Sequence, residues 1–124
     1  MKPAPTVLLI DDDPSVRASV CRVLGAEAMQ VIAARGVKDA LEYIFRYVPD
    51  LVVTDMCMAP LSGWDLIAYL KDQYPALPVF VISALPPPFA GDEMEKIGAY
   101  FQKPLDLDQL VAAIRCQIMP GSSR

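Results

Sequence analysis

The residues best suited to chemistry in this chain are acids that directly follow apolar runs. Leu51–Val53 is too short for a helix and rich in β-branched residues, so it predicts a strand buried on both faces of a parallel sheet, and it leads into Asp55. Val7–Ile10 is a second such run, followed by Asp11, Asp12 and Asp13. Ligands of an open α/β sheet bind beyond the carboxyl ends of its strands. Two strands that both end in acid therefore predict one acidic pocket.

Two further polar side chains follow predicted strands, Ser83 and Lys103. Carboxylates packed together repel one another and lose hydration, and a hard divalent cation relieves both costs. Mg²⁺ prefers oxygen ligands and commonly takes one or two carboxylates with waters and phosphate oxygens. A hydroxyl and a lysine beside such a metal suit phosphoryl transfer, and an Asp carboxylate can be the nucleophile that forms an acyl phosphate.

The elements that must position these side chains alternate along the chain. Strands are expected over 6–10, 30–34, 51–54, 79–82 and 99–102. Helices are expected from Asp13-Pro14 to Gly25, over an apolar face of Ala40, Leu41, Ile44 and Phe45, around 64–70, in a short stretch of 92–97, and over 107–118. Pro86–Pro88 is expected to be a stiff extended linker. The alternation predicts a doubly wound, five-stranded parallel α/β sheet with helices on both faces.

Composition limits the class of protein. The 124 residues suit one domain, and 54% hydrophobic content supports a real core. A net charge of −4 argues against a nucleic-acid surface, and no apolar run is long enough to span a membrane. The N-terminal residues run straight into a predicted strand, so no signal peptide is expected. Three cysteines and no histidine suit a reducing cytoplasm and make zinc improbable.

The motifs together resemble the receiver domain of two-component response regulators. They are Ile10–Asp13, Asp55 with Met58 and Gly63 after it, Ser83-Ala84 and Lys103-Pro104. Each is weak alone, but their order at the strand ends is specific, and the match spans residues 6–119. The resemblance implies a single receiver domain over 1–124 with a tail at 120–124. It also implies a flavodoxin-like sheet of order 2-1-3-4-5 and a phosphorylation-switched signalling domain of a phosphorelay.

The resemblance also implies roles for the acids. Asp55 would be the phosphoacceptor, taking the phosphoryl group from a histidine kinase or phosphotransfer protein. Asp12, Asp55 and the backbone carbonyl of Cys57 would bind Mg²⁺ directly, and Asp11 would act partly through water. Asp13 is assigned instead to capping the following helix. The protein would catalyse only its own phosphorylation and dephosphorylation, so it is not expected to be an enzyme in the usual sense.

The remaining roles concern the switch. Ser83 would hydrogen-bond the phosphoryl group, Lys103 would pair with it, and the Lys103-Pro104 bond is expected to be cis. Tyr100 matches the family's aromatic switch position, although plain packing is as good an account of it. The output surface would be the face made by the family's fourth helix, fifth strand and fifth helix. Its fourth helix looks shortened by Pro86–Pro88, so a mostly monomeric protein is expected.

Two further departures from the family and three alternatives accompany this interpretation. Ala59 and then Pro60 follow Met58, where the family has proline at once, and Cys57 replaces a usual polar or basic residue. A degenerate receiver that only binds proteins is one alternative, opposed by the intact acid cluster. A haloacid-dehalogenase-like phosphatase needs a second Asp where Cys57 stands. A flavodoxin-like cofactor binder needs phosphate-binding donors where Asp11–Asp13 would repel phosphate.

Overall fold

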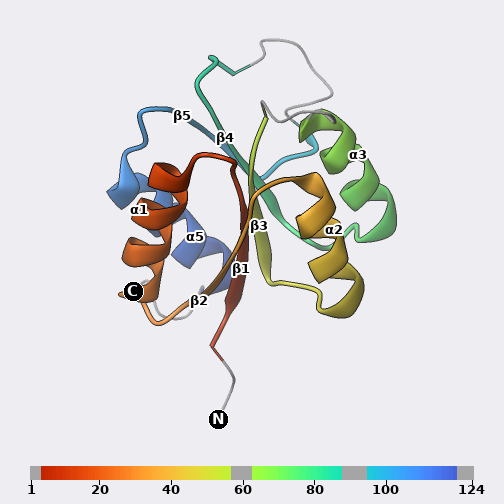
Figure 1. The fold of residues 1–124 in the computed structure, drawn as a ribbon, viewed down its shortest axis with the longest axis horizontal. Helices are drawn as coiled ribbons and strands as arrows, with labels where there is room; N and C mark the ends of the chain where they lie inside the picture. The colour runs from red at the N-terminus through yellow and green to blue at the C-terminus, as the bar shows by residue number, and fades with distance from the viewer. Residues whose placement is uncertain (1–3, 57–62, 88–94, 120–124) are drawn as a thin grey trace.

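A five-stranded parallel sheet forms the centre of the structure (Figure 1), a computed structural model that describes residues 4–56, 63–87 and 95–119. The strands are β1 (Thr6–Ile10), β2 (Gln30–Ala34), β3 (Leu51–Asp55), β4 (Val79–Ser83) and β5 (Ala99–Gln102). The helices are α1 (Pro14–Gly25), α2 (Val37–Arg46), α3 (Gly63–Gln73) and α5 (Leu107–Ile118). No helix among these residues has the length and apolar character that a membrane span requires.

The strands follow the order β2-β1-β3-β4-β5, and every neighbouring pair is parallel. This confirms the doubly wound sheet and the order that the resemblance implies. Ile10 of β1 lies opposite Thr54 of β3, and Asp55 lies opposite Ile82 of β4. The register therefore brings the carboxyl ends of β1, β3 and β4 to one edge of the sheet, where parallel α/β sheets place their ligands.

Two apolar clusters cover the two faces of the sheet. One cluster joins the sheet to α2 and α3, and the other joins it to α1 and α5. Figure 1 shows the first pair of helices on one side of the sheet and the second pair on the other. Alternate residues of β1 divide between them, with Leu8 in the first cluster and Leu9 in the second. β3 and β4 are buried at every position. Burial on both faces explains why these strands are continuous apolar runs rather than alternating ones.

The structure corrects two details of the expected elements. Phe45 was expected on the buried face of α2, but 65% of its surface is exposed. The buried residues of α2 are Val37, Ala40 and Ile44, and Phe45 lies one helical step beyond Ile44, which turns it toward solvent. β3 and β4 each extend one residue further than expected, so that Asp55 and Ser83 are the last residues of strands. Residues 92–94, the first half of the short helix expected over 92–97, lie outside the described residues.

Candidate functional site

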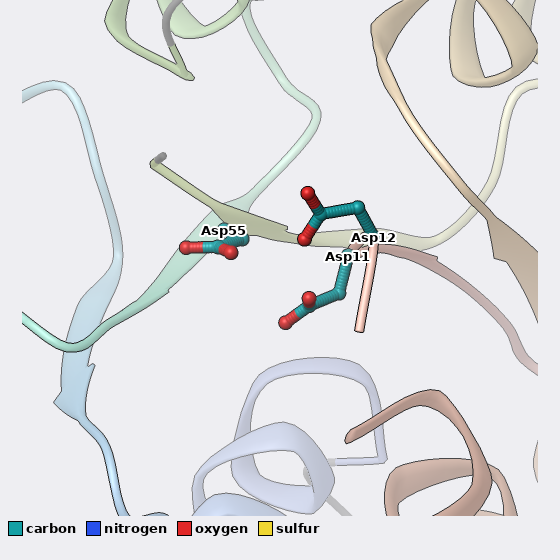
Figure 2. A group of neighbouring side chains, drawn as sticks. All are labelled: Asp11, Asp12 and Asp55. Carbon is teal, nitrogen blue, oxygen red and sulfur yellow. The ribbon is translucent and has the colours of Figure 1, made fainter. Parts of the chain in front are cut away.

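Three carboxylates gather at the ends of β1 and β3 (Figure 2). Asp11, Asp12 and Asp55 each place one carboxylate oxygen within 4.8 Å of the others. Asp11 is fully buried, Asp55 is 5% exposed, and Asp12 faces solvent. Asp55 is the last residue of β3, and Asp11 and Asp12 are the first and second residues after β1. The predicted acidic pocket is therefore present, open to solvent on the side of Asp12.

Hydrogen bonds hold every polar group of Asp11. Its N–H donates to the Ala34 carbonyl at 3.1 Å, which continues the pairing of β1 with β2. Its Oδ1 accepts from the Asp13 N–H at 2.9 Å, and its Oδ2 accepts from Lys103 Nζ at 2.9 Å. Its carbonyl accepts from Arg17 Nη1 at 2.9 Å. This complete set of partners makes a fully buried carboxylate tolerable.

Lys103 bridges the two buried acids. Its Nζ lies 2.9 Å from Asp11 Oδ2 and 3.4 Å from Asp55 Oδ2, and its side chain is 20% exposed. The backbone N–H of Lys103 donates to the Ser83 carbonyl at 2.7 Å, which fixes the loop after β5 against the end of β4. The bond to Pro104 is cis, as expected. The structure thus unites four of the predicted site residues: Asp11, Asp12, Asp55 and Lys103.

Burial and charge act against each other in this cluster. Burial raises the pKa of Asp11, and the charge of Asp55 adds to the rise, although the Asp13 N–H and Lys103 oppose it. Burial alone would lower the pKa of Lys103, but its hydrogen bond to Asp11 and the charges of Asp11 and Asp55 outweigh burial and raise it. The lysine therefore stays protonated at neutral pH, where it offsets part of the repulsion among the acids.

Asp13 has the capping role that the sequence predicts. Its backbone is extended, and its Oδ1 accepts from the Ser15 N–H at 2.8 Å in front of Pro14. This satisfies one of the free N–H groups at the start of α1. Within the described residues, one other helix start has a side-chain cap, because Asp106 accepts from the Gln109 N–H at the start of α5. Asp13 thereby orients α1 without contributing to the acid cluster.

Ser83 and Tyr100 meet through the backbone of Leu85. Ser83 is fully buried, and its Oγ accepts from the Leu85 N–H at 3.1 Å. The Tyr100 hydroxyl donates to the Leu85 carbonyl at 2.8 Å and lies 3.3 Å from the Pro86 carbonyl. The Tyr100 ring packs at the edge of the cluster that joins the sheet to α2 and α3. One peptide segment therefore links the two residues predicted to form the switch.

The donor set suits a hard cation. The three acids offer only oxygen atoms, which Mg²⁺ prefers, and their mutual repulsion favours a cation between them. Cys57, whose carbonyl is the other predicted ligand, lies outside the described residues. Neither Arg17 nor the Leu85 backbone was expected at the site. The sequence did hold one signal for Arg17. A helical side chain points toward the N-terminus of its helix, so an arginine in the first turn of α1 can reach back to the acids before the helix.

Comparison with known families and proteins agrees with this geometry. The sequence model described as the response regulator receiver domain matches residues 7–115. The chain is 35% identical over 105 residues to the response regulator protein PilR of Pseudomonas aeruginosa, covering 83% of this chain and 24% of that protein. It is 33% identical over 110 residues to the DNA-binding transcriptional regulator NtrC of Proteus hauseri, covering 87% and 23%. The chain spans about a quarter of the length of these relatives.

Solved structures share the fold. A signal receiver domain of an HD domain-containing protein from Pseudomonas fluorescens Pf-5 superposes with a TM-score of 0.83 at 23% identity, covering 98% of this chain and 99% of that one. The response regulator TrrA of Thermotoga maritima, solved in complex with Mg²⁺-BeF, gives a TM-score of 0.82 at 21% identity, covering 90% and 96%. At these identities the likeness establishes the arrangement of strands and helices.

Proposed function

Because this chain belongs to the receiver domains of two-component response regulators, which are phosphoacceptor signalling domains, we propose that Asp55 is its phosphoacceptor. The observation that carries the proposal is the position of Lys103 between Asp11 and Asp55, beside the exposed carboxylate of Asp12. Of the two buried carboxylates, Asp55 ends the central strand β3, where one oxygen is fixed by the Met56 N–H at 2.7 Å. Its second oxygen faces Lys103 and would be the attacking nucleophile.

The proposed transfer uses these side chains together with bound Mg²⁺. One oxygen of Asp55 attacks the phosphorus of a phosphohistidine on the donor protein, forming a P–O bond while the P–N bond breaks. The departing imidazole nitrogen keeps the electron pair and takes up a proton. Lys103 pairs with the phosphoryl oxygens as charge develops on them. Asp11, Asp12, Asp55 and the carbonyl of Cys57 would hold Mg²⁺, which would supply further neutralisation of that charge.

The signal would leave the site through Ser83. A phosphoryl group on Asp55 adds negative charge and acceptor oxygens near the end of β4. If Ser83 turns its hydroxyl to that group, its bond from the Leu85 N–H is lost. Leu85 also holds the Tyr100 hydroxyl through its carbonyl, so the change reaches Tyr100 and the surface of β5. The proposed switch is therefore a competition for the Ser83 hydroxyl.

The partners follow from this chemistry. The donor would be a sensor histidine kinase or a phosphotransfer protein in the cytoplasm, and the output would be another protein or a fused domain. The chain would act as one receiver domain, mostly monomeric, with no direct nucleic-acid contact of its own and no enzymatic turnover beyond its own phosphorylation state. Its net charge of −4 supports the absence of nucleic-acid binding in this domain.

Intact-mass measurement with acetyl phosphate tests the proposal. We expect the wild-type chain to gain one phosphoryl group with Mg²⁺ and none with EDTA, and Asp55→Asn to gain none. Asp39→Asn, which removes an exposed acid on α2, is the matched control and should label fully. Undiminished labelling of Asp55→Asn would reject the assignment. Steady hydrolysis of a generic phosphate ester would instead favour a phosphatase.

A further inference from the structure

Arg17 lies beside the acid cluster in a way that phosphoryl transfer does not explain. Its Nη1 donates to the main-chain carbonyl of Asp11 at 2.9 Å, and the contact is partly buried. Across residues 4–56, 63–87 and 95–119, Arg17 forms no ion pair with any carboxylate. A cation next to three acids thus directs its hydrogen bond to a neutral carbonyl.

The start of α1 makes this contact possible. Arg17 is one turn into the helix, and its N–H donates to the Asp13 carbonyl as part of the first helical turn. Helical side chains point toward the N-terminus of their helix, so the guanidinium folds back over the residues that precede α1. The Asp13 cap and the Arg17 side chain together tie the turn between β1 and α1 to the helix.

The contact fixes the peptide that joins Asp11 to Asp12. The N–H and both carboxylate oxygens of Asp11 already have partners in Ala34, Asp13 and Lys103. Its carbonyl is the one remaining polar group, and Arg17 holds it. The plane of this peptide sets the direction in which the chain leaves β1, and therefore the direction of the Asp12 side chain.

Asp12 depends on that peptide for its orientation. Its carboxylate is exposed, and within the described part of the chain no hydrogen bond or ion pair holds it. Asp11 and Asp55, by contrast, are each held by backbone N–H groups and by Lys103. Of the three acids, Asp12 is the one whose position must come from its backbone.

We propose that Arg17 is a positioning residue for Mg²⁺, holding the Asp11-Asp12 peptide so that the Asp12 carboxylate faces the cation. This inference rests on the proposed function, since it concerns the same metal. The charge of Arg17 acts in the opposite direction, because one cation repels another. Removing the side chain weakens Mg²⁺ binding if positioning dominates and strengthens it if charge dominates. The sign of the change therefore decides between the two roles.

Calorimetric titration with MgCl₂ alone is the decisive measurement, repeated by following Trp64 fluorescence. Arg17→Met keeps the apolar stem without charge or donor, and Arg17→Ala keeps high helix propensity should the first variant fold poorly. Groups that orient metal ligands typically change metal affinity by about 10- to 100-fold, so we expect at least a tenfold loss in both variants. Arg22→Met is the matched control, because it removes the same charge from an exposed position of α1.

The outcomes separate this inference from the proposed function. Weaker Mg²⁺ binding by the Arg17 variants, with Arg22→Met like the wild type, supports the positioning role. Equal or tighter binding by the Arg17 variants overturns it, and so does an equal loss in Arg22→Met. A wild-type chain that binds no Mg²⁺ would instead reject the proposed function.

Discussion

Lys103 makes the burial of Asp11 tolerable. Asp11 is fully buried and burial raises its pKa, so its charge counts against folding at neutral pH, and a nearby cation offsets part of that cost. Among the described residues Lys103 is that cation, and its Nζ lies 2.9 Å from Asp11 Oδ2. The same ammonium group that would meet the phosphoryl oxygens therefore has a prior role in holding the empty site together.

The pKa of Lys103 predicts a pH dependence of stability. Because its pKa is raised above the usual 10.5, its stabilising contribution is complete below pH 10.5 and is lost as pH rises through the folded-state value. Without Mg²⁺, Lys103→Gln should lower the free energy of unfolding at neutral pH by about 1–3 kcal/mol, the cost of leaving a buried partner unsatisfied. Urea unfolding should show that difference shrinking in alkali. A difference that stays constant above pH 10.5 would contradict the assignment.

The neighbouring acids Asp12 and Asp13 should separate metal binding from stability. Asp12→Ala removes a carboxylate of the cluster and should weaken Mg²⁺ binding strongly, with little effect on thermal unfolding in EDTA. Asp13→Ala removes the bond to the Ser15 N–H and should cost about 1 kcal/mol of stability, with little effect on Mg²⁺ binding. Titration calorimetry and thermal unfolding measure the two quantities, and equal effects of both variants on metal affinity would show that the pocket is misplaced.

Much of the site could be predicted because its residues sit at strand ends. The position of Asp11, Asp55 and Lys103 follows from where three parallel strands stop, and parallel strands share one edge. Arg17 could not be predicted in the same way, because its contact depends on a side-chain direction and on a free carbonyl. The hydrogen bond from the Tyr100 hydroxyl to the Leu85 carbonyl could not be predicted either. It involves a backbone group, and the pairing of β4 with β5 decides which side chain lies beside that group.

Among the elements, β3 and β4 show how pattern and structure diverge at the boundaries. Continuous apolar runs predicted both strands, yet each extends one residue further, to Asp55 and to Ser83. The apolar run stops before the polar residue at the end of each strand, whereas the pairing between strands includes Asp55 and Ser83. Phe45 shows the converse, because an apolar residue next to a buried helical face need not belong to it.

The entry into β5 offers a test of packing. A methyl group added at Gly98 would lie 2.8 Å from Cε1 of Phe80, whose ring is 2% exposed and packs against Phe101. Since crowding of this kind typically costs about 1–3 kcal/mol, Gly98→Ala should lower the free energy of unfolding by that amount. Gly25→Ala, where no atom lies within 4 Å, is the control and should leave stability unchanged or slightly raised. Equal midpoints in urea for the two variants would contradict the packing argument.

For the molecule as a whole, the exposed apolar side chains lie mostly away from the site. Phe45, Tyr47 and Val48 belong to α2 and the loop after it, near the amino-terminal edge of the sheet. Leu85, beside the proposed switch, is the large exposed apolar residue at the other edge in the described range. A single exposed leucine is a small area for a stable symmetric interface. This favours a switch surface that another protein reads.

Sedimentation with and without beryllofluoride tests that expectation. We expect a mostly monomeric chain in both states, because phosphorylation changes a loop rather than exposing a large apolar face. Amide exchange at Ala84 and Leu85 and over residues 95–101 should nevertheless change, since the bond from Leu85 to Ser83 is the one that the phosphoryl group would replace. The matched control is Ser83→Ala, in which the mimic should leave that exchange unaltered. A tight dimer formed with the mimic would contradict the prediction.

The lysine and the acid that close the site are 92 positions apart in the sequence. A ribosome has therefore finished Asp11 and Asp55 well before it reaches Lys103, and β5 is the last strand to be made. An unfinished copy of the chain holds the proposed phosphoacceptor but neither the compensating cation nor the strand that supports β4. Its acids repel one another without Lys103 to offset the repulsion, and β4 lacks its neighbour on one side. We therefore expect the complete acid–lysine site, and with it the proposed phosphorylation, only after β5 and Lys103 have been synthesised.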